Sequence, residues 1–281
     1  MIAVPVSETA FAKINLALHV RQRRTDGYHE LETLFAFVDD GDQLTVEVAD
    51  ADRLAISGEF ADGLSNGPDN LVLRALDLAR RKGAKVPPLA ITLEKNLPVA
   101  AGLGGGSADA GALLRLMLRK WPDGLDANAL VAASVELGAD VPACVRSITA
   151  IATGVGDVMT PVSDSDVAGM AVLLVNPLEP VATGPVFAGW DAVDRGPMPS
   201  GSAREITRAG RNDLTAPAMQ ICPDIDEVLT VLRAQLPWAA RMSGSGATCF
   251  ALFASDAAME AAANRLWDDY PDWWLMAGHL R

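Results

Sequence analysis

The feature that most constrains this chain is a run of four glycines within five residues, from Gly102 to Gly106. Glycine has no Cβ, so such a loop can adopt positive φ angles and bring consecutive backbone N–H groups close to an anion. Apolar residues then recur at helical spacing over residues 108–119, which predicts a helix whose first-turn amides face the loop. This arrangement favours a bound diphosphate, although a tight structural turn can have the same pattern.

Neither of the two common phosphate-loop patterns fits this run. No Gly-Lys-Ser or Gly-Lys-Thr closes it, which argues against a loop of the Walker A type. Ser107 occupies the last glycine position of a Gly-x-Gly-x-x-Gly motif, which argues against a dinucleotide fold. The loop therefore indicates a different kind of nucleotide site, and the rest of the chain has to decide between that site and a structural turn.

Length and composition limit the classes of protein to consider. A chain of 281 residues exceeds the usual size of one hydrophobic core, so we expect two domains, residues 1–162 and 163–281, divided at the polar stretch 163–166. The formal net charge of −13 argues against a nucleic-acid partner. Apolar runs are only strand-length and the first residues lack a secretion signal, so we expect a soluble, cytoplasmic protein without a membrane partner. The oligomeric state is not defined by the sequence.

Three cysteines, Cys144, Cys222 and Cys249, lie far apart and without the spacing of metal ligands. They are predicted to be small buried hydrophobes.

Sharp alternation over residues 10–20 predicts a half-buried strand. Lys13 and Asn15 share its second face, which for a lysine is ordinarily exposed to solvent. A turn at residues 27–31 then brings Tyr28 and His29 next to each other. Further strands are predicted at residues 44–48 and 89–95, and helices at 70–82 and 126–137. Asp140 follows the last of these helices.

The second half of the chain changes pattern. A continuous apolar strand is predicted at residues 170–175, an amphipathic helix at 224–235, and a second Gly/Ser-rich loop at 241–248. A strand at 249–253, a helix at 256–268 and a last strand near 273–280 complete a half of the β-α-β type.

Three stretches, in this order along the chain, resemble the three motifs of the GHMP small-molecule kinases: residues 12–16, 98–107 and 243–247. Residues 26–33 and 138–142 resemble signatures of the family members that act on 4-diphosphocytidyl-2-C-methyl-D-erythritol. Phe11 and Ala108 depart from the family pattern, which often has proline and serine there. Five ordered motifs are far more specific than the glycine loop alone.

The resemblance implies an α+β fold with an N-terminal ATP-binding α/β domain, a C-terminal ferredoxin-like α+β domain, and an active site in the cleft between them. It implies ATP-dependent phosphorylation of the 2-hydroxyl of the substrate's methylerythritol part, with Mg²⁺, in the non-mevalonate route to isoprenoids. No protein carboxylate can be assigned to the metal, and Ser107 is a candidate ligand. The alternatives are another GHMP kinase, for homoserine, mevalonate or a sugar, and a non-catalytic nucleotide-binding protein of the same fold.

The same resemblance implies which residues touch the nucleotide and carry the chemistry. Asp140 would accept or orient the proton of the acceptor hydroxyl, and Lys13 would keep Asp140 ionised and lower the pKa of the hydroxyl. A carboxylate beyond the C-terminal end of a helix is unfavourable unless a cation pairs with it, and Lys13 would be that cation. Lys95 and Leu71 would border the adenine. The loop residues in contact with the nucleotide would be Pro98, Val99, Ala100, Ala101, Gly102, Leu103, Gly104, Gly105, Gly106, Ser107 and Ala108.

The acceptor substrate, a cytidine diphosphate derivative, would be recognised by four side chains. Asn15 would bind its polar backbone, Tyr28 would stack on the cytosine, and His29 would form hydrogen bonds with the edge of the base. Phe187 would be a second stacking aromatic, and ordinary core packing is the alternative for this residue.

Overall fold

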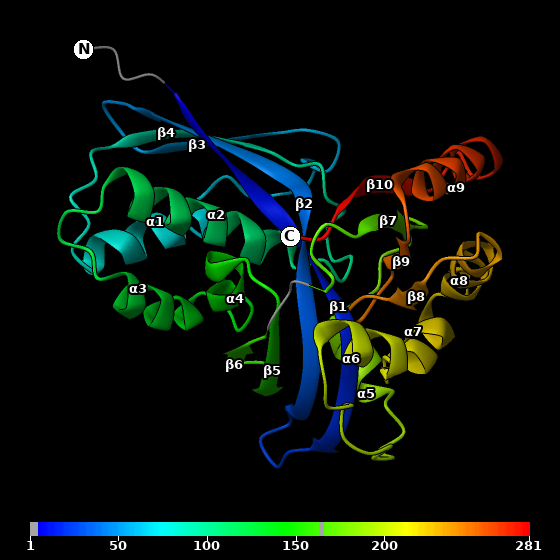
Figure 1. The fold of residues 1–281 in the computed structure, drawn as a ribbon. Coiled ribbons are helices and arrows are strands. Elements are labelled where there is room, and N and C mark those ends of the chain that lie inside the picture. Colours follow the sequence, from blue (N-terminus) through cyan, green and yellow to red (C-terminus); the bar gives the residue numbers. More distant parts are fainter. Residues whose placement is uncertain (1–4, 163–165) are drawn as a thin grey trace. The chain divides into compact units, whose positions relative to one another are not determined.

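The computed structural model describes residues 5–162 and 166–281, which form two compact units (Figure 1). The first unit contains the described residues up to 12, residues 40–99 and residues 104–147, and the second contains residues 13–39, 100–103 and the rest of the chain. Two long strands, β1 (Val6–Arg23) and β2 (His29–Val48), contribute residues to both. The predicted domain boundary adjoins residues 163–165, which lie outside the described ranges, so the division at 162/163 stays a prediction.

The first unit packs helices on a small sheet. β4 (Leu89–Glu94) pairs antiparallel with the second half of β2 and parallel with β3 (Arg53–Ser57). α1 (Leu71–Arg81) begins at Asn70, whose side chain accepts a hydrogen bond from the Val72 amide, as N-cap residues commonly do. Apolar faces of the strands, α1 and α2 (Gly105–Lys120) form the core of this unit. α3 (Ala127–Ala133), the 3-10 helix η1 (Ser134–Glu136) and α4 (Val141–Arg146) complete it.

The second unit contains a four-stranded antiparallel sheet in the order β10-β7-β9-β8. With α8 (Asp224–Ala234) and α9 (Asp256–Asp269), these strands run along the chain as β-α-β-β-α-β, the ferredoxin-like arrangement, and Figure 1 shows both helices on the same side of the sheet. The strands are β7 (Ala171–Asn176), β8 (Ala239–Met242), β9 (Cys249–Phe253) and β10 (Trp274–His279). The predicted ferredoxin-like half is therefore confirmed.

The remaining described elements of the second unit are short strands next to the first half of β2 and short helices that follow β7 in the chain. β5 (Ala150–Gly154) pairs antiparallel with β2, and β6 (Val158–Pro161) pairs with β5. Three short helices follow: α5 (Thr183–Ala188), α6 (Ala203–Ala209) and α7 (Thr215–Ile221). These short elements, together with β3, β8 and α4, were not predicted.

Two predicted helices have different bounds in the structure. The helix expected from residue 108 begins at Gly105, so the last two glycines of the loop are already helical. The helix expected over residues 126–137 is capped by Asp126 as predicted, but it divides into α3 and η1.

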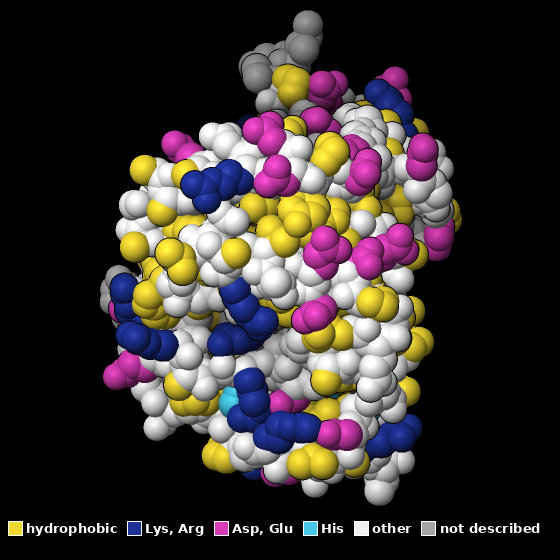
Figure 2. All heavy atoms as spheres, turned by 90° about the vertical axis from the view of Figure 1, so that its right-hand side faces the viewer, with side chains coloured by type: hydrophobic (Ala, Val, Ile, Leu, Met, Phe, Trp, Pro, Cys, Tyr) yellow, Lys and Arg dark blue, Asp and Glu magenta, His cyan; other side chains and the backbone are white. Residues whose placement is uncertain are grey.

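The environment of the cysteines and the polarity of the helices were both predicted from the sequence. Cys144, Cys222 and Cys249 are buried, which confirms their prediction as buried hydrophobes. Within the described ranges, every helix is too short or too polar to cross a membrane. Figure 2 shows most of the acidic side chains in the upper and right-hand parts of the face that it presents, and several Lys and Arg side chains in its left and lower parts.

Candidate active site

The start of α2 contains the part of the glycine loop that lies in the first unit. Gly104 precedes the helix with φ 64° and ψ 25°, a left-handed conformation that glycine adopts readily. The next residues, Gly105 and Gly106, lack positive φ angles and form the first turn. Amides of a first helical turn have no acceptor within the helix, so this turn can bind an anion.

Two predicted site segments flank this first turn. A Cβ built on Gly106 would lie 3.5 Å from Leu71 Cδ1, so the residue expected beside the adenine does lie against the loop. A Cβ built on Gly138 would lie 3.9 Å from Ser107 Oγ, which places the turn that leads to Asp140 beside the same helix. The first unit thus brings together the predicted adenine wall, the phosphate loop and the approach to Asp140.

Asp140 immediately precedes α4, and this changes the electrostatic argument made from the sequence. The sequence pattern placed Asp140 beyond the C-terminal end of a helix, whereas in the structure the helix that adjoins it begins at Val141. A helix N-terminus is a more favourable place for a carboxylate than a C-terminal end. The six residues of α4 are too few to show helical periodicity, which explains why the sequence did not reveal it.

Close packing fixes α4 against α2. A Cβ on Gly111 would lie 2.7 Å from the carbonyl carbon of Cys144, so only glycine allows this approach. Arg115, one turn further along α2, donates to the Cys144 carbonyl and to Ser147 Oγ at the end of α4. The position of Asp140 relative to the phosphate loop is therefore set by contacts within one unit.

Lys95 is almost completely buried. Its ammonium donates to Asp109 Oδ2 at 2.8 Å and to Asp42 Oδ2. Burial alone lowers the pKa of Lys95, but Asp109 and Asp42 outweigh this effect and raise it. The side chain therefore faces the interior of the first unit, and the prediction that Lys95 borders the adenine stays a prediction.

In the second unit, all three family motifs meet at the middle of the glycine loop. The Lys13 amide on β1 donates to the Leu103 carbonyl at 3.0 Å, and Ser243 Oγ donates to the Gly102 carbonyl at 2.8 Å. Ser243 Oγ also accepts a hydrogen bond from the backbone N–H of Asn15 at 3.1 Å. A Cβ on Gly102 would lie 2.4 Å from the Ser243 carbonyl oxygen, so this position requires glycine.

Lys13 and Asn15 are buried, although a strand lysine is ordinarily exposed. The Lys13 ammonium lies 5.5 Å from the centroid of the Phe35 ring. Asn15 Nδ2 donates to Thr33 Oγ1 at 2.8 Å, and that hydroxyl in turn donates to the Ala17 carbonyl at 2.7 Å. Lys13 and Asn15 thus lie in the interior of the second unit, Lys13 near the Phe35 ring and Asn15 in a hydrogen bond with Thr33.

An aromatic cluster forms around His29 at the start of β2. The His29 ring lies 5.1 Å from the Phe187 ring and 5.7 Å from the Trp190 ring, centroid to centroid, and meets Trp190 edge-on. Burial, with a smaller contribution from Arg23, lowers the pKa of His29 and favours a neutral imidazole. Tyr28 is 66% exposed, so its ring is available for stacking.

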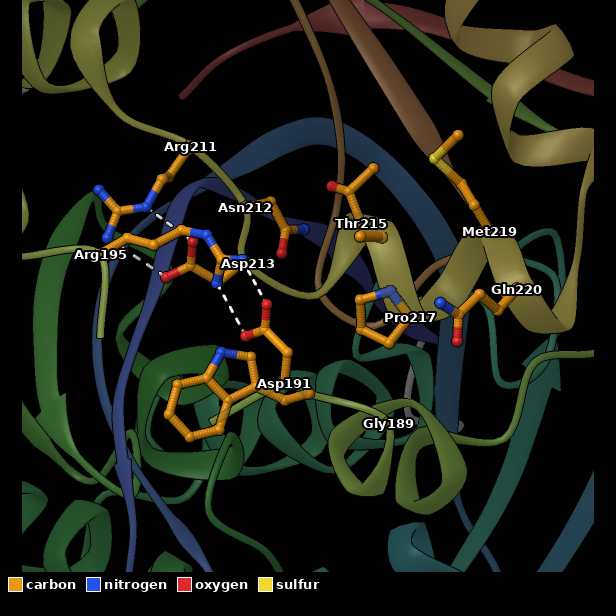
Figure 3. Close-up of a pocket in the computed structure, with 12 residues that line it drawn as sticks. Gly189, Asp191, Arg195, Arg211, Asn212, Asp213, Thr215, Pro217, Met219 and Gln220 are labelled. Carbon is orange, nitrogen blue, oxygen red and sulfur yellow. Dashed lines mark hydrogen bonds and ion pairs between the residues drawn. The ribbon is translucent and has the colours of Figure 1, made fainter. Parts of the chain in front are cut away.

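Trp190 was not identified from the sequence, and its position three residues after Phe187 was the available signal. Trp190 also lines a cavity of about 380 Å³ in the second unit (Figure 3). In the wall of this cavity Arg195 pairs with Asp191, and Arg211 pairs with Asp213. Each guanidinium already has a carboxylate partner, so the wall presents ion pairs.

The described residues contain no group of three or more His, Cys, Asp or Glu side chains that could hold a metal ion.

The fold and the motifs define a class of protein. The family model for the GHMP kinases N terminal domain matches residues 70–147, and the model for the GHMP kinases C terminal domain matches residues 200–272. The fold is also similar to that of a homoserine kinase from Cytophaga hutchinsonii, at 16% identity and a TM-score of 0.63, with 100% of this chain and 96% of that chain covered. The chain has the two-domain α+β fold of the GHMP kinases, as predicted.

Relatives identify the branch of the class. The chain is 56% identical to the 4-diphosphocytidyl-2-C-methyl-D-erythritol kinase of Sphingopyxis alaskensis, with 98% of each chain covered, and 55% identical to that of Erythrobacter litoralis, with 98% and 100% covered. A crystal structure of a 4-(cytidine 5'-diphospho)-2C-methyl-D-erythritol kinase matches with a TM-score of 0.81 at 33% identity, covering 98% of this chain and 99% of that one. This chain belongs to the 4-diphosphocytidyl-2-C-methyl-D-erythritol kinase family.

Proposed function

We propose that this protein transfers the γ-phosphoryl group of ATP to the 2-hydroxyl group of 4-diphosphocytidyl-2-C-methyl-D-erythritol, in the non-mevalonate route to isoprenoid precursors. The bond from the β,γ-bridging oxygen to the γ-phosphorus breaks, the substrate oxygen bonds to that phosphorus, and ADP leaves. The observation that carries the specific substrate is the cluster of His29, Phe187 and Trp190, because a base-binding site distinguishes this reaction from those of other GHMP kinases.

The nucleotide phosphates would bind the first-turn amides of α2, from Gly105 to Ser107. Phosphoryl transfer depends chiefly on positioning and on neutralising charge, and fixed backbone amides supply both. Gly104 supports this assignment because its left-handed conformation turns the chain into the helix. Leu71, in contact with the same turn, would then form one wall of the adenine site.

Asp140 would accept the proton of the acceptor hydroxyl, and Lys13 would stabilise the developing alkoxide. Asp140 supports this role by its position at the start of α4, where a helix N-terminus favours a carboxylate. The burial of Lys13 supports its role because a charge that is removed from water interacts more strongly with a neighbouring charge. Asn15 would bind a hydroxyl of the methylerythritol part.

His29 and Tyr28 would recognise the cytosine. A neutral imidazole carries one N–H donor and one acceptor nitrogen, so His29 can match either kind of group on the edge of the base. The exposed ring of Tyr28 would stack on one face of the base, and the Phe187 ring, next to His29, would be a second stacking aromatic.

Mg²⁺ would accompany ATP. Magnesium prefers oxygen ligands and usually retains several waters in sites of this kind. No group of three or more His, Cys, Asp or Glu side chains in the described part of the chain could hold a metal ion, so the phosphates and water would provide most of its ligands. When bound, it would neutralise charge on the transferred group.

One assay tests the substrate. ADP release would be measured with 4-diphosphocytidyl-2-C-methyl-D-erythritol, homoserine, mevalonate and galactose, each at a range of concentrations. The proposal expects turnover with the cytidyl substrate alone. Preferred turnover of homoserine, mevalonate or galactose would favour another GHMP kinase activity, and ATP binding without turnover of any acceptor would favour a nucleotide-binding protein.

A further inference from the structure

A buried cluster of one lysine and two aspartates lies beneath the first turn of α2, and of these three residues the sequence analysis singled out only Lys95. The Lys95 ammonium donates to Asp109 Oδ2 at 2.8 Å and also to Asp42 Oδ2. All three residues are buried, with at most 4% of each exposed. Charged groups are kept inside a protein only where partners compensate for the lost water, so the cluster is a costly feature that needs a reason.

Asp42 holds the backbone that leads into the glycine loop. Its Oδ1 accepts hydrogen bonds from the amides of Asn96 at 2.6 Å and Leu97 at 2.8 Å. These two residues connect the end of β4 to Pro98, where the loop begins. A single carboxylate therefore fixes the direction in which the chain enters the loop.

Asp109 belongs to the other end of the loop. It lies on α2, four residues after Gly105 and hence on the same face of the helix. A Cβ on Gly105 would lie 3.5 Å from Lys95 Nζ and 3.8 Å from Asp42 Oδ2, so the cluster sits directly against the first residue of α2. Lys95 thus connects the carboxylate that holds the loop entrance to the helix that forms the loop exit.

We infer that Asp42, Lys95 and Asp109 are positioning residues that hold the entrance and the exit of the glycine loop at the separation required for nucleotide phosphates. This inference rests on the proposed ATP-dependent function. Small displacements of binding groups reduce turnover steeply, which accounts for a costly buried cluster at this position.

A proton on Asp109 would make the charge of the cluster more compatible with an anionic ligand. One ammonium facing two carboxylates leaves a surplus negative charge beneath a turn that would bind phosphate. Burial raises the pKa of Asp109 to about 8, although Lys95 opposes the shift. Among the described residues, Asp109 Oδ1 has no hydrogen-bond partner, so a proton there displaces no existing contact.

Substitution of Asp42 separates positioning from general stability. Asp42→Ala removes the acceptor for both loop amides, whereas Asp42→Asn keeps an acceptor oxygen and removes the charge. Asp52→Ala is the matched control, because Asp52 accepts from the Leu89 amide at 2.8 Å and pairs with Arg80 at the opposite end of β4. The dissociation constant of ATP would be measured by calorimetry, and the KM values of both substrates by ADP release.

The inference expects Asp42→Ala to weaken ATP binding by about tenfold or more with little change in the KM of the acceptor, and Asp42→Asn to recover part of the loss. Asp52→Ala should lower the free energy of unfolding and leave ATP affinity unchanged. Equal effects of the Asp42 and Asp52 substitutions on ATP affinity would overturn the inference. Wild-type protein that binds no ATP would refute the proposed function as well, whereas ATP binding that survives in folded Asp42→Ala refutes the inference alone.

A second variant tests the cluster if Asp42→Ala does not fold. Asp109→Asn has the shape of the protonated carboxyl and cannot ionise. Wild-type protein should lose ATP affinity as the pH rises above about 8, where Asp109 adds its negative charge beneath the loop, and the variant should lack this decline. Parallel pH profiles for the two proteins would contradict a positioning cluster whose charge acts on the nucleotide.

Discussion

Thr33 provides a stringent test of the acceptor site because its hydroxyl fixes the orientation of Asn15. The hydroxyl donates its only hydrogen to the Ala17 carbonyl at 2.7 Å, so it can only accept from Asn15. The Asn15 amide must therefore present Nδ2 to Thr33, at 2.8 Å, and direct Oδ1 away from it. Asn15 can then accept a hydrogen bond from a substrate hydroxyl.

Thr33→Val preserves the shape of the side chain and removes both hydrogen bonds. A buried polar group without a partner costs about 1–3 kcal/mol, and here the side-chain amide of Asn15 loses its hydrogen bond to Thr33. If the amide rotates to recover a partner, kcat/KM for the acceptor should fall by about tenfold to a hundredfold. The KM of ATP should not change, because the Thr33 hydroxyl bonds to Asn15 and Ala17 on β1, whereas the phosphates would bind the first turn of α2.

The assay is steady-state ADP release with each substrate varied in turn. Thr33→Ser restores the hydroxyl and should recover most of the acceptor kcat/KM. Thr45→Val, on the same strand, removes only an exposed hydrogen bond to Ser7 and is the control for valine in β2. The reasoning fails if Thr33→Val matches wild type, or if it raises the KM of ATP as much as that of the acceptor.

Four further results are expected. Asp140→Asn should bind both substrates and lose turnover by about 10² to 10⁴-fold in ADP release, as expected for a general base; near-full activity would exclude it from the mechanism. Gly104→Ala should raise the KM of ATP, whereas Gly63→Ala, which has a similar positive φ of 78° and open space around it, should not. Tyr28→Ala should lower kcat/KM for the cytidyl substrate by the roughly 1–3 kcal/mol of a stacked base, with Tyr28→Phe mild; equal losses would argue against stacking. The pKa of Asp109 is about 8 in the folded protein and 3.8 for an ordinary aspartate, so the folded state binds the extra proton between these pH values. The free energy of unfolding, measured in urea, should therefore fall as the pH rises from about 3.8 to about 8 and level off above it. Asp109→Asn should flatten this slope.

Periodicity predicted the long helices because it reports repeated burial, whereas β2 was predicted only over residues 44–48 of its full length, His29–Val48. The apolar positions of α1, α8 and α9 recur over three or more turns, and their predicted bounds agree with the structure within about two residues. Shorter elements such as β3 and α4 have too few positions to repeat, so tertiary packing decides them. The close contact between Gly111 and Cys144 shows this for α4, since nothing in the local sequence marks that glycine.

The buried cluster beneath α2 could not be predicted for a different reason. Lys95 is separated in sequence from Asp42 by 53 residues and from Asp109 by 14, and each residue type is ordinarily exposed. A local pattern therefore assigns all three to the surface. The pairing of β4 with β2 and the packing of α2 bring the three residues together. Once they are together, their opposite charges compensate for the burial of each one.

The strand that carries Lys13 shows where sequence reasoning could have gone further. Alternation over residues 10–20 predicted a strand buried on one face, but residues 12–20 are buried on both. The polar residues of the second face then become interior groups that need partners, and the structure provides them: Thr33 for Asn15, and the Arg211 amide for the ring of His19. Buried polar groups are costly unless they are hydrogen-bonded, so a strand that retains them on a covered face retains them for a purpose. The polar residues of β1 have two different roles along the strand. His19 accepts a hydrogen bond from the loop before α7. Lys13 and Asn15 lie beside the glycine loop and the Ser243 turn, where the phosphoryl acceptor would bind.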